Sequence, residues 1–121
     1  MPLCSRKVSA LSETHPIDLT HKWQDQTLTV EDIVPKVVAY AEDRKIPLVL
    51  DEARIIARQI HRAYKKYHDP PEYAGKFIRE LAKDSVRRVL MVADNLNQRA
   101  LIVYHYYFYN CAQGDWREKL R

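Results

Sequence analysis

The stretch Asp51–His68, DEARIIARQIHRAYKKYH, decides the predicted fold. Its apolar residues recur every three or four positions, which is the spacing of one side of an α-helix. Its cations fall between them at intervals of four residues. We therefore predict an amphipathic helix with one buried side and one positively charged side. The apolar positions are Ala53, Ile56, Ala57, Ile60, Tyr64 and Tyr67.

The positively charged side of this helix is named here the cationic face, and it consists of Arg54, Arg58, Arg62, Lys65 and Lys66. With about 100° between successive residues, these side chains fall in one arc, opposite the apolar positions. Ile55 falls in the same arc and is expected to be exposed among the charges. The like-charged pairs four residues apart cost the helix about 1 kcal/mol in total. A phosphate chain lying along the face would remove this repulsion.

The remaining segments predict an all-α fold, a compact bundle of four to five helices. Residues 1–28 are expected to form a less regular N-terminal arm that packs on the core through Trp23, and residues 29–121 to form the bundle domain. Only two glycines occur in the chain, which are few for a β-rich fold with many tight turns.

The first helix of the bundle is expected to begin near Thr29, because TVED places an acid three residues after a hydroxyl cap. Pro35 leaves two alternatives open. If Asp32 is the N-cap, Pro35 lies in the first turn, where its missing N–H costs nothing; if Thr29 is the N-cap, we expect a kink. Pro47 ends this segment before the Asp51–His68 helix.

After the HDPPE sequence we expect one long helix to about Asp94, with Asp69 as its cap and a proline in its first turn. DNLNQ is the expected hinge to a last segment, ALIVYHYYFYNCAQG. This segment has strand-like residues but the length of a helix, and we predict a helix because a lone strand would lack a partner.

The long helix carries a second cationic row, which consists of Lys76, Arg79, Lys83, Arg87 and Arg88. Glu80 and Asp84 lie nearby and can pair with Arg87 or Arg88. This row is therefore partly self-neutralised. Residues 54–88 hold ten Lys and Arg against four Asp and Glu, whereas the net charge of the whole chain is only +4.

The aromatic run of the last segment has two interpretations. Exposed rings can stack on unpaired bases, but such a run more often fills a core or contacts another protein. Helical geometry places Tyr104, Tyr107, Phe108 and Cys111 inward. Tyr106 and Tyr109 point outward and are predicted to bind a partner. The exposed Ile55 of the Asp51–His68 helix is the third predicted partner-binding residue.

No catalytic set is predicted, so an enzyme is not expected, and neither is a cofactor or a metal. His68-Asp69 resembles the metal-binding dipeptide of HD-domain phosphohydrolases, but it precedes Pro70-Pro71 at a helix end instead of lying within a helix. The two cysteines form no C-x-x-C motif, and no apolar run is long enough for a signal peptide or a membrane span. We expect a cytoplasmic protein without a membrane partner.

Residues 30–112, with the cations of RIIARQIHRAYKK and KFIRELAKDSVRR, resemble the small subunit of CRISPR surveillance complexes of the Cascade kind. Those small subunits are helical bundles that contact nucleic acid through basic side chains. The resemblance implies a non-catalytic subunit of an antiviral ribonucleoprotein, present in more than one copy. Its cations would hold the backbone of single-stranded DNA, displaced or target, or of the guide–target duplex, and its exposed apolar groups would contact the large and backbone subunits.

Two other functions remain open at this point. The second is a helical protein-interaction or transcription-related module whose cationic face meets an acidic partner. The HD-type phosphohydrolase is the third. The sequence does not distinguish DNA from RNA as the nucleic acid that is bound.

Overall fold

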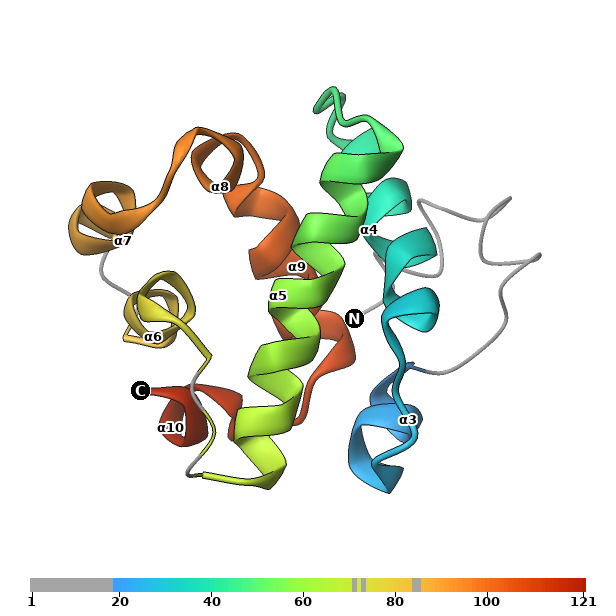
Figure 1. Cartoon of the computed structure of the whole chain (residues 1–121), viewed down its shortest axis with the longest axis vertical. Coiled ribbons are helices and arrows are strands. Elements are labelled where there is room, and N and C mark those ends of the chain that lie inside the picture. The colour runs from blue at the N-terminus through green and yellow to red at the C-terminus, as the bar shows by residue number, and fades with distance from the viewer. Residues whose placement is uncertain (1–18, 71, 73, 84–85) are drawn as a thin grey trace.

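The computed structural model describes residues 19–70, 72, 74–83 and 86–121, without the side chains of Val86 and Arg87. Every regular element in these ranges is a helix, which confirms the all-α prediction (Figure 1). Of the expected N-terminal arm, residues 1–28, the first 18 lie outside the described residues. The helices are α3 (Leu19–Asp25), α4 (Val30–Asp43), α5 (Leu50–His68), α6 (Lys76–Ala82), α7 (Val86–Val92), α8 (Asn95–Arg99), α9 (Leu101–Cys111) and α10 (Trp116–Leu120).

Helix α4 begins at the first of the two expected caps. The Thr29 hydroxyl accepts a hydrogen bond from the Asp32 backbone N–H, and the Asp32 carboxylate accepts one from the Thr29 N–H. Pro35 therefore lies inside the helix, where it cannot donate the hydrogen bond that the Glu31 carbonyl would normally accept. Burial opposes the ionisation of Asp32, but the hydrogen bonds from Thr29 and Lys22 outweigh it and lower the pKa of this carboxyl.

Helix α5 occupies the predicted stretch and begins one residue earlier, at Leu50. Its apolar positions are buried as predicted, except that Tyr67 is only partly buried. In Figure 1 it runs through the centre of the molecule, between α4 and the segment that contains α6, α7 and α8.

The expected start of the next helix was wrong. Asp69 follows the last residue of α5, and α6 begins only at Lys76, after Gly75. Gly75 has a φ of 97°, a backbone conformation that a residue without a Cβ adopts at little cost.

The long helix expected to reach Asp94 is also wrong, because the chain forms two helices, α6 and α7, with a break after Ala82 (Figure 1). Asp94, expected in a hinge, caps the short helix α8 by accepting a hydrogen bond from the Asn97 N–H. The last segment is helical as predicted and forms α9, which ends at Cys111.

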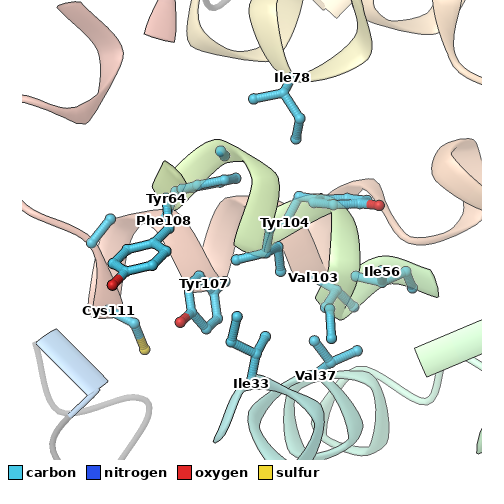
Figure 2. Packing of buried hydrophobic residues seen from close by; sticks show 14 of the residues in the cluster. Ile33, Val37, Ile56, Tyr64, Ile78, Val103, Tyr104, Tyr107, Phe108 and Cys111 are labelled. Atoms are coloured by element: carbon cyan, nitrogen blue, oxygen red, sulfur yellow. The ribbon is translucent and has the colours of Figure 1, made fainter. Parts of the chain in front are cut away.

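The core is formed by side chains from α3, α4, α5, α6, α7, α9 and α10. Figure 2 shows Val103, Tyr104 and Tyr107 of α9 pointing among apolar side chains of the neighbouring helices. The inward positions expected for Tyr104, Tyr107, Phe108 and Cys111 are confirmed, since all four are buried. The Tyr104 hydroxyl is one of the polar groups in this core, and it donates to the Asn97 side chain at 2.7 Å.

The sequence did not predict α10. Trp116 stacks on Phe108 with 4.6 Å between the ring centroids, and Leu120 is buried. The Tyr67 hydroxyl donates a hydrogen bond to Asp115, which ties the start of α10 to α5. Burial, together with this hydrogen bond and the Asp115 charge, raises the pKa of Tyr67 to about 12.

None of the helices in the described ranges has both the length and the apolar character needed to cross a lipid bilayer.

Trp23 holds α3 against the core, as the sequence suggested. It is fully buried, and its ring contacts Tyr64 and Tyr67 of α5 and Phe108 of α9 edge-on, at centroid distances of 5.5, 5.4 and 6.2 Å. Such aromatic pairs stabilise a fold by more than the burial of their area.

Replacing Trp23 by alanine is therefore expected to lower the free energy of unfolding by about 3–5 kcal/mol, the usual range for a buried aromatic side chain. Urea denaturation followed by circular dichroism measures this change. Gln24→Ala, at an exposed position of the same helix, is the matched control and should change it little. A loss below about 1 kcal/mol for Trp23→Ala would contradict the packing of α3 described above.

Candidate nucleic-acid interface

The cationic face lies on the side of α5 that points away from the core. Ala53, Ile56, Ala57 and Ile60 are completely buried on the opposite side. Arg54, Arg58, Arg62 and Lys65 are exposed, and Lys66 is partly exposed. The predicted division of α5 into a buried side and a charged side is confirmed.

Two interactions fix the flank of α5 that faces α8. The Glu52 carboxylate accepts hydrogen bonds from the Val49 backbone N–H and from the Arg99 guanidinium, the latter at 2.7 Å. Gln59 donates to the side chain of Asn97 at 3.0 Å. These contacts join this flank of α5 to α8 and to the residues just before α5, and they add to the buried positions that set the direction of the cationic face.

Two histidines fix the other flank. A His61 ring nitrogen lies 3.1 Å from the carbonyl oxygen of Leu28, and a His68 ring nitrogen lies 2.6 Å from that of Trp23. Both rings also contact the Tyr64 ring. No pattern in the sequence indicated that these histidines join α5 to α3 and to the loop before α4.

Arg58, Arg62 and Lys65 form the uncompensated part of the cationic face. Within the described residues these three side chains make no ion pair and no hydrogen bond. Successive i, i+4 positions are about 6 Å apart along a helix axis, so the three charges lie within about 11 Å along the axis. This is a concentrated positive charge with no acidic group at ion-pair distance in the described structure.

The two ends of the cationic face are partly engaged. The Arg54 guanidinium lies 3.9 Å from the Glu31 carboxylate, and Lys66 donates a hydrogen bond to the Pro70 carbonyl at 3.0 Å. An exposed ion pair of this length contributes little to stability. Glu31 nevertheless lowers the local positive potential at this end of the face.

Ile55 lies among these cations with 42% of its surface exposed, as the sequence predicted. Exposure of a β-branched apolar side chain at this position is not explained by packing within the chain. It gives the cationic face one apolar contact point.

The second cationic row does not form a continuous surface, because the break after Ala82 divides it between two helices. Lys76, Arg79 and Lys83 are exposed on and just after α6, and Arg88 is exposed on α7. The side chains of Arg87 and Asp84 lie outside the described residues. Glu80 pairs with Lys83 at 3.6 Å, within its own helix turn.

Tyr106 and Tyr109, predicted to remain available to a partner, differ in exposure. Tyr109 is 65% exposed. Tyr106 is partly buried: its ring lies 5.7 Å from that of Tyr40, with the Arg44 guanidinium 4.6 Å from its centroid. Sequence reasoning missed both Arg44 and Arg117, the second of which lies over the Tyr109 ring.

Within the described residues, the HD-type arrangement is not reproduced around His68. This side chain contacts the Trp23 carbonyl, and the adjacent Asp69 is exposed at the end of α5. No group of three or more His, Cys, Asp or Glu side chains suited to a metal ion occurs in the described part of the chain.

Comparison with protein-family models, with curated proteins and with solved structures gave no match. The functional argument therefore depends on the geometry of the chain itself.

The contact of Glu52 with Arg99 should make stability depend on pH. The Arg99 guanidinium, followed by the Val49 N–H, lowers the pKa of Glu52 below its usual value of 4.5. A carboxyl whose pKa is lower in the folded state stabilises the fold above its unfolded pKa, and this stabilisation is lost as pH falls through the folded pKa.

We therefore expect the difference in unfolding free energy between the original chain and Glu52→Gln to be largest near neutral pH and to disappear in acid. Urea denaturation at a series of pH values measures this difference. Glu118→Gln, an exposed substitution on α10, is the control. A difference that stays constant down to pH values well below 4.5 would contradict the role given to this carboxylate.

Proposed function

We propose that the chain is a non-catalytic nucleic-acid-binding protein that holds a phosphate backbone along the cationic face of α5. The resemblance noted in the sequence extends this proposal to a role as a small subunit of a Cascade-type surveillance complex. In that setting the strand would be the displaced or target strand, or the guide–target duplex. The observation that carries the proposal is the grouping of Arg58, Arg62 and Lys65 without an ion pair in the described structure.

The energetics of polyelectrolytes support a phosphate backbone as the partner. Each cation that neutralises a phosphate releases a condensed counterion, and this release favours binding at low salt. For three to five such contacts to a single strand, the logarithm of the binding constant should fall with the logarithm of salt concentration with a slope of about −2 to −3.5. No base-reading arrangement is required, so the expected binding tolerates many sequences.

The rigidity of α5 also supports the proposal. The cations project from a long helix whose flanks are fixed by Glu52, Gln59, His61 and His68. Charges on such a helix need little reordering of the backbone when a ligand binds. The remaining cost is the ordering of the side chains themselves.

Ile55 supports one alternative, a protein-interaction module. An apolar side chain surrounded by cations suits an acidic protein segment with one apolar anchor. Such a module would bind its protein partner and would show no salt-sensitive affinity for nucleic acid. A titration with oligonucleotide at low salt separates the two functions.

Charge removal on the cationic face tests the proposal. For a single-stranded oligonucleotide, Arg62→Gln should reduce the magnitude of the salt slope by about 0.7, and Arg58→Gln with Arg62→Gln by about 1.4. Fluorescence anisotropy at several salt concentrations gives these slopes, and circular dichroism checks that both variants remain helical.

Lys45→Gln is the matched control, because it removes one exposed cation from the loop after α4. It should leave the slope unchanged. Equal slopes for the original chain and the double variant, or no binding by the original chain at low salt, would show that the cationic face does not bind nucleic acid.

A further inference from the structure

Helix α9 has a second side, which carries the exposed ring of Tyr109 and the partly buried rings of His105 and Tyr106. Its buried side is formed by Val103, Tyr104, Tyr107, Phe108 and Cys111. The other side carries His105, Tyr106 and Tyr109, which we name the α9 aromatic face.

Two rings of this face, His105 and Tyr109, are nearly parallel, and an arginine accompanies Tyr109. His105 and Tyr109 are stacked, with 6.5 Å between centroids and 23° between ring planes. The Arg117 guanidinium lies 5.4 Å from the Tyr109 centroid and donates to the Tyr109 hydroxyl at 3.0 Å. Tyr109 is nevertheless 65% exposed.

Tyr106, about one helical turn before Tyr109, also has an arginine beside its ring. The Arg44 guanidinium lies 4.6 Å from its ring centroid. Asp43 lies 3.9 Å from Arg44 and offsets part of that charge. Residues three apart on a helix are neighbours on its surface, so the partly buried Tyr106 lies next to the exposed Tyr109, and each ring has an arginine beside it.

We propose that the α9 aromatic face stacks on unpaired bases of single-stranded nucleic acid, an inference that rests on the proposed function. Aromatic rings next to cations are the combination by which proteins bind single strands: the rings stack on bases, and the cations meet the phosphates between them. The α9 aromatic face therefore favours single-stranded nucleic acid as the ligand. The cationic face of α5 would bind the phosphates of a single strand or of a duplex.

Charge disfavours a second copy of the chain as the occupant. A symmetric dimer through this face would bring Arg44 and Arg117 of one copy toward the same cations of the other. A single-stranded nucleic acid suits this surface better, because its phosphates can contact the arginines and its bases can stack on the aromatic rings. The α9 aromatic face and the cationic face of α5 are separate surfaces. The buried residues of both helices belong to one core, and each of the two faces lies on the side of its helix away from that core.

Two ligands test the proposal on the full chain: a fluorescein-labelled oligothymidylate, and an abasic oligodeoxynucleotide of the same length, which keeps the phosphates but has no bases. Tyr109→Ala should weaken binding of the oligothymidylate by about 5- to 150-fold, the range for one lost stacking contact. It should bind the abasic strand as the original chain does.

Tyr109→Phe keeps the ring and should bind the oligothymidylate almost as tightly as the original chain does. Met91→Ala is the control, because it removes a side chain that is 76% exposed on α7 and should change neither affinity. Tyr109 is an exposed residue, so its replacement should leave the circular-dichroism spectrum unchanged.

The outcomes separate the two proposals. If Tyr109→Ala binds the oligothymidylate normally while Arg58→Gln with Arg62→Gln binds both strands weakly, base stacking at α9 is wrong and the proposed function stands. Equal weakening of both ligands by Tyr109→Ala, or a loss with Tyr109→Phe as large as with Tyr109→Ala, also overturns the stacking. If the original chain binds neither strand at low salt, the proposed function fails and the stacking site fails with it.

Discussion

Burial of one side of α5 is the constraint on which the candidate interface depends. Ala53, Ile56, Ala57 and Ile60 are fully removed from solvent. Because α5 is a single helix of 19 residues, burying these positions determines where every other side chain of the helix points. Arg58, Arg62 and Lys65 are exposed because the opposite side of α5 is buried in the core. Their exposure does not depend on any contact that these three side chains make.

The electrostatic cost of this arrangement is small compared with the packing that maintains it. Repulsion along the cationic face costs about 1 kcal/mol, whereas a single buried leucine or isoleucine side chain contributes about 1.5–3 kcal/mol. The fold therefore tolerates uncompensated cations at little cost. Proteins often store such local costs at binding sites, where the ligand relieves them.

The sequence predicted the parts of the fold that depend on periodicity. The two sides of α5 and the inward residues of α9 followed from helical spacing alone, and Ile55 is exposed as that spacing requires. The break between α6 and α7 was missed because the apolar period continues through it and neither Gly nor Pro interrupts residues 76–94. Asp84-Ser85 are residue types that favour helix N-caps, and they were the available signal.

The residues that orient the interface were harder to predict. His61 and His68 bond to backbone carbonyls 33 and 45 residues away in the chain, and Arg117 reaches Tyr109 from α10. Such contacts depend on how the helices pack, which a single sequence does not specify. The short helix α10 was missed because WREKL is too brief to show a period.

The most direct measurement of the central claim is an NMR titration of the 15N-labelled chain with oligothymidylate, observed at the arginine side-chain Nε–H groups. The account predicts that the signals of Arg58 and Arg62 shift as the strand binds. The signal of Arg99, which is held by Glu52 and the Pro47 carbonyl, should stay in place. Binding that leaves Arg58 and Arg62 unshifted, or the absence of any binding at low salt, would contradict the assignment of the cationic face.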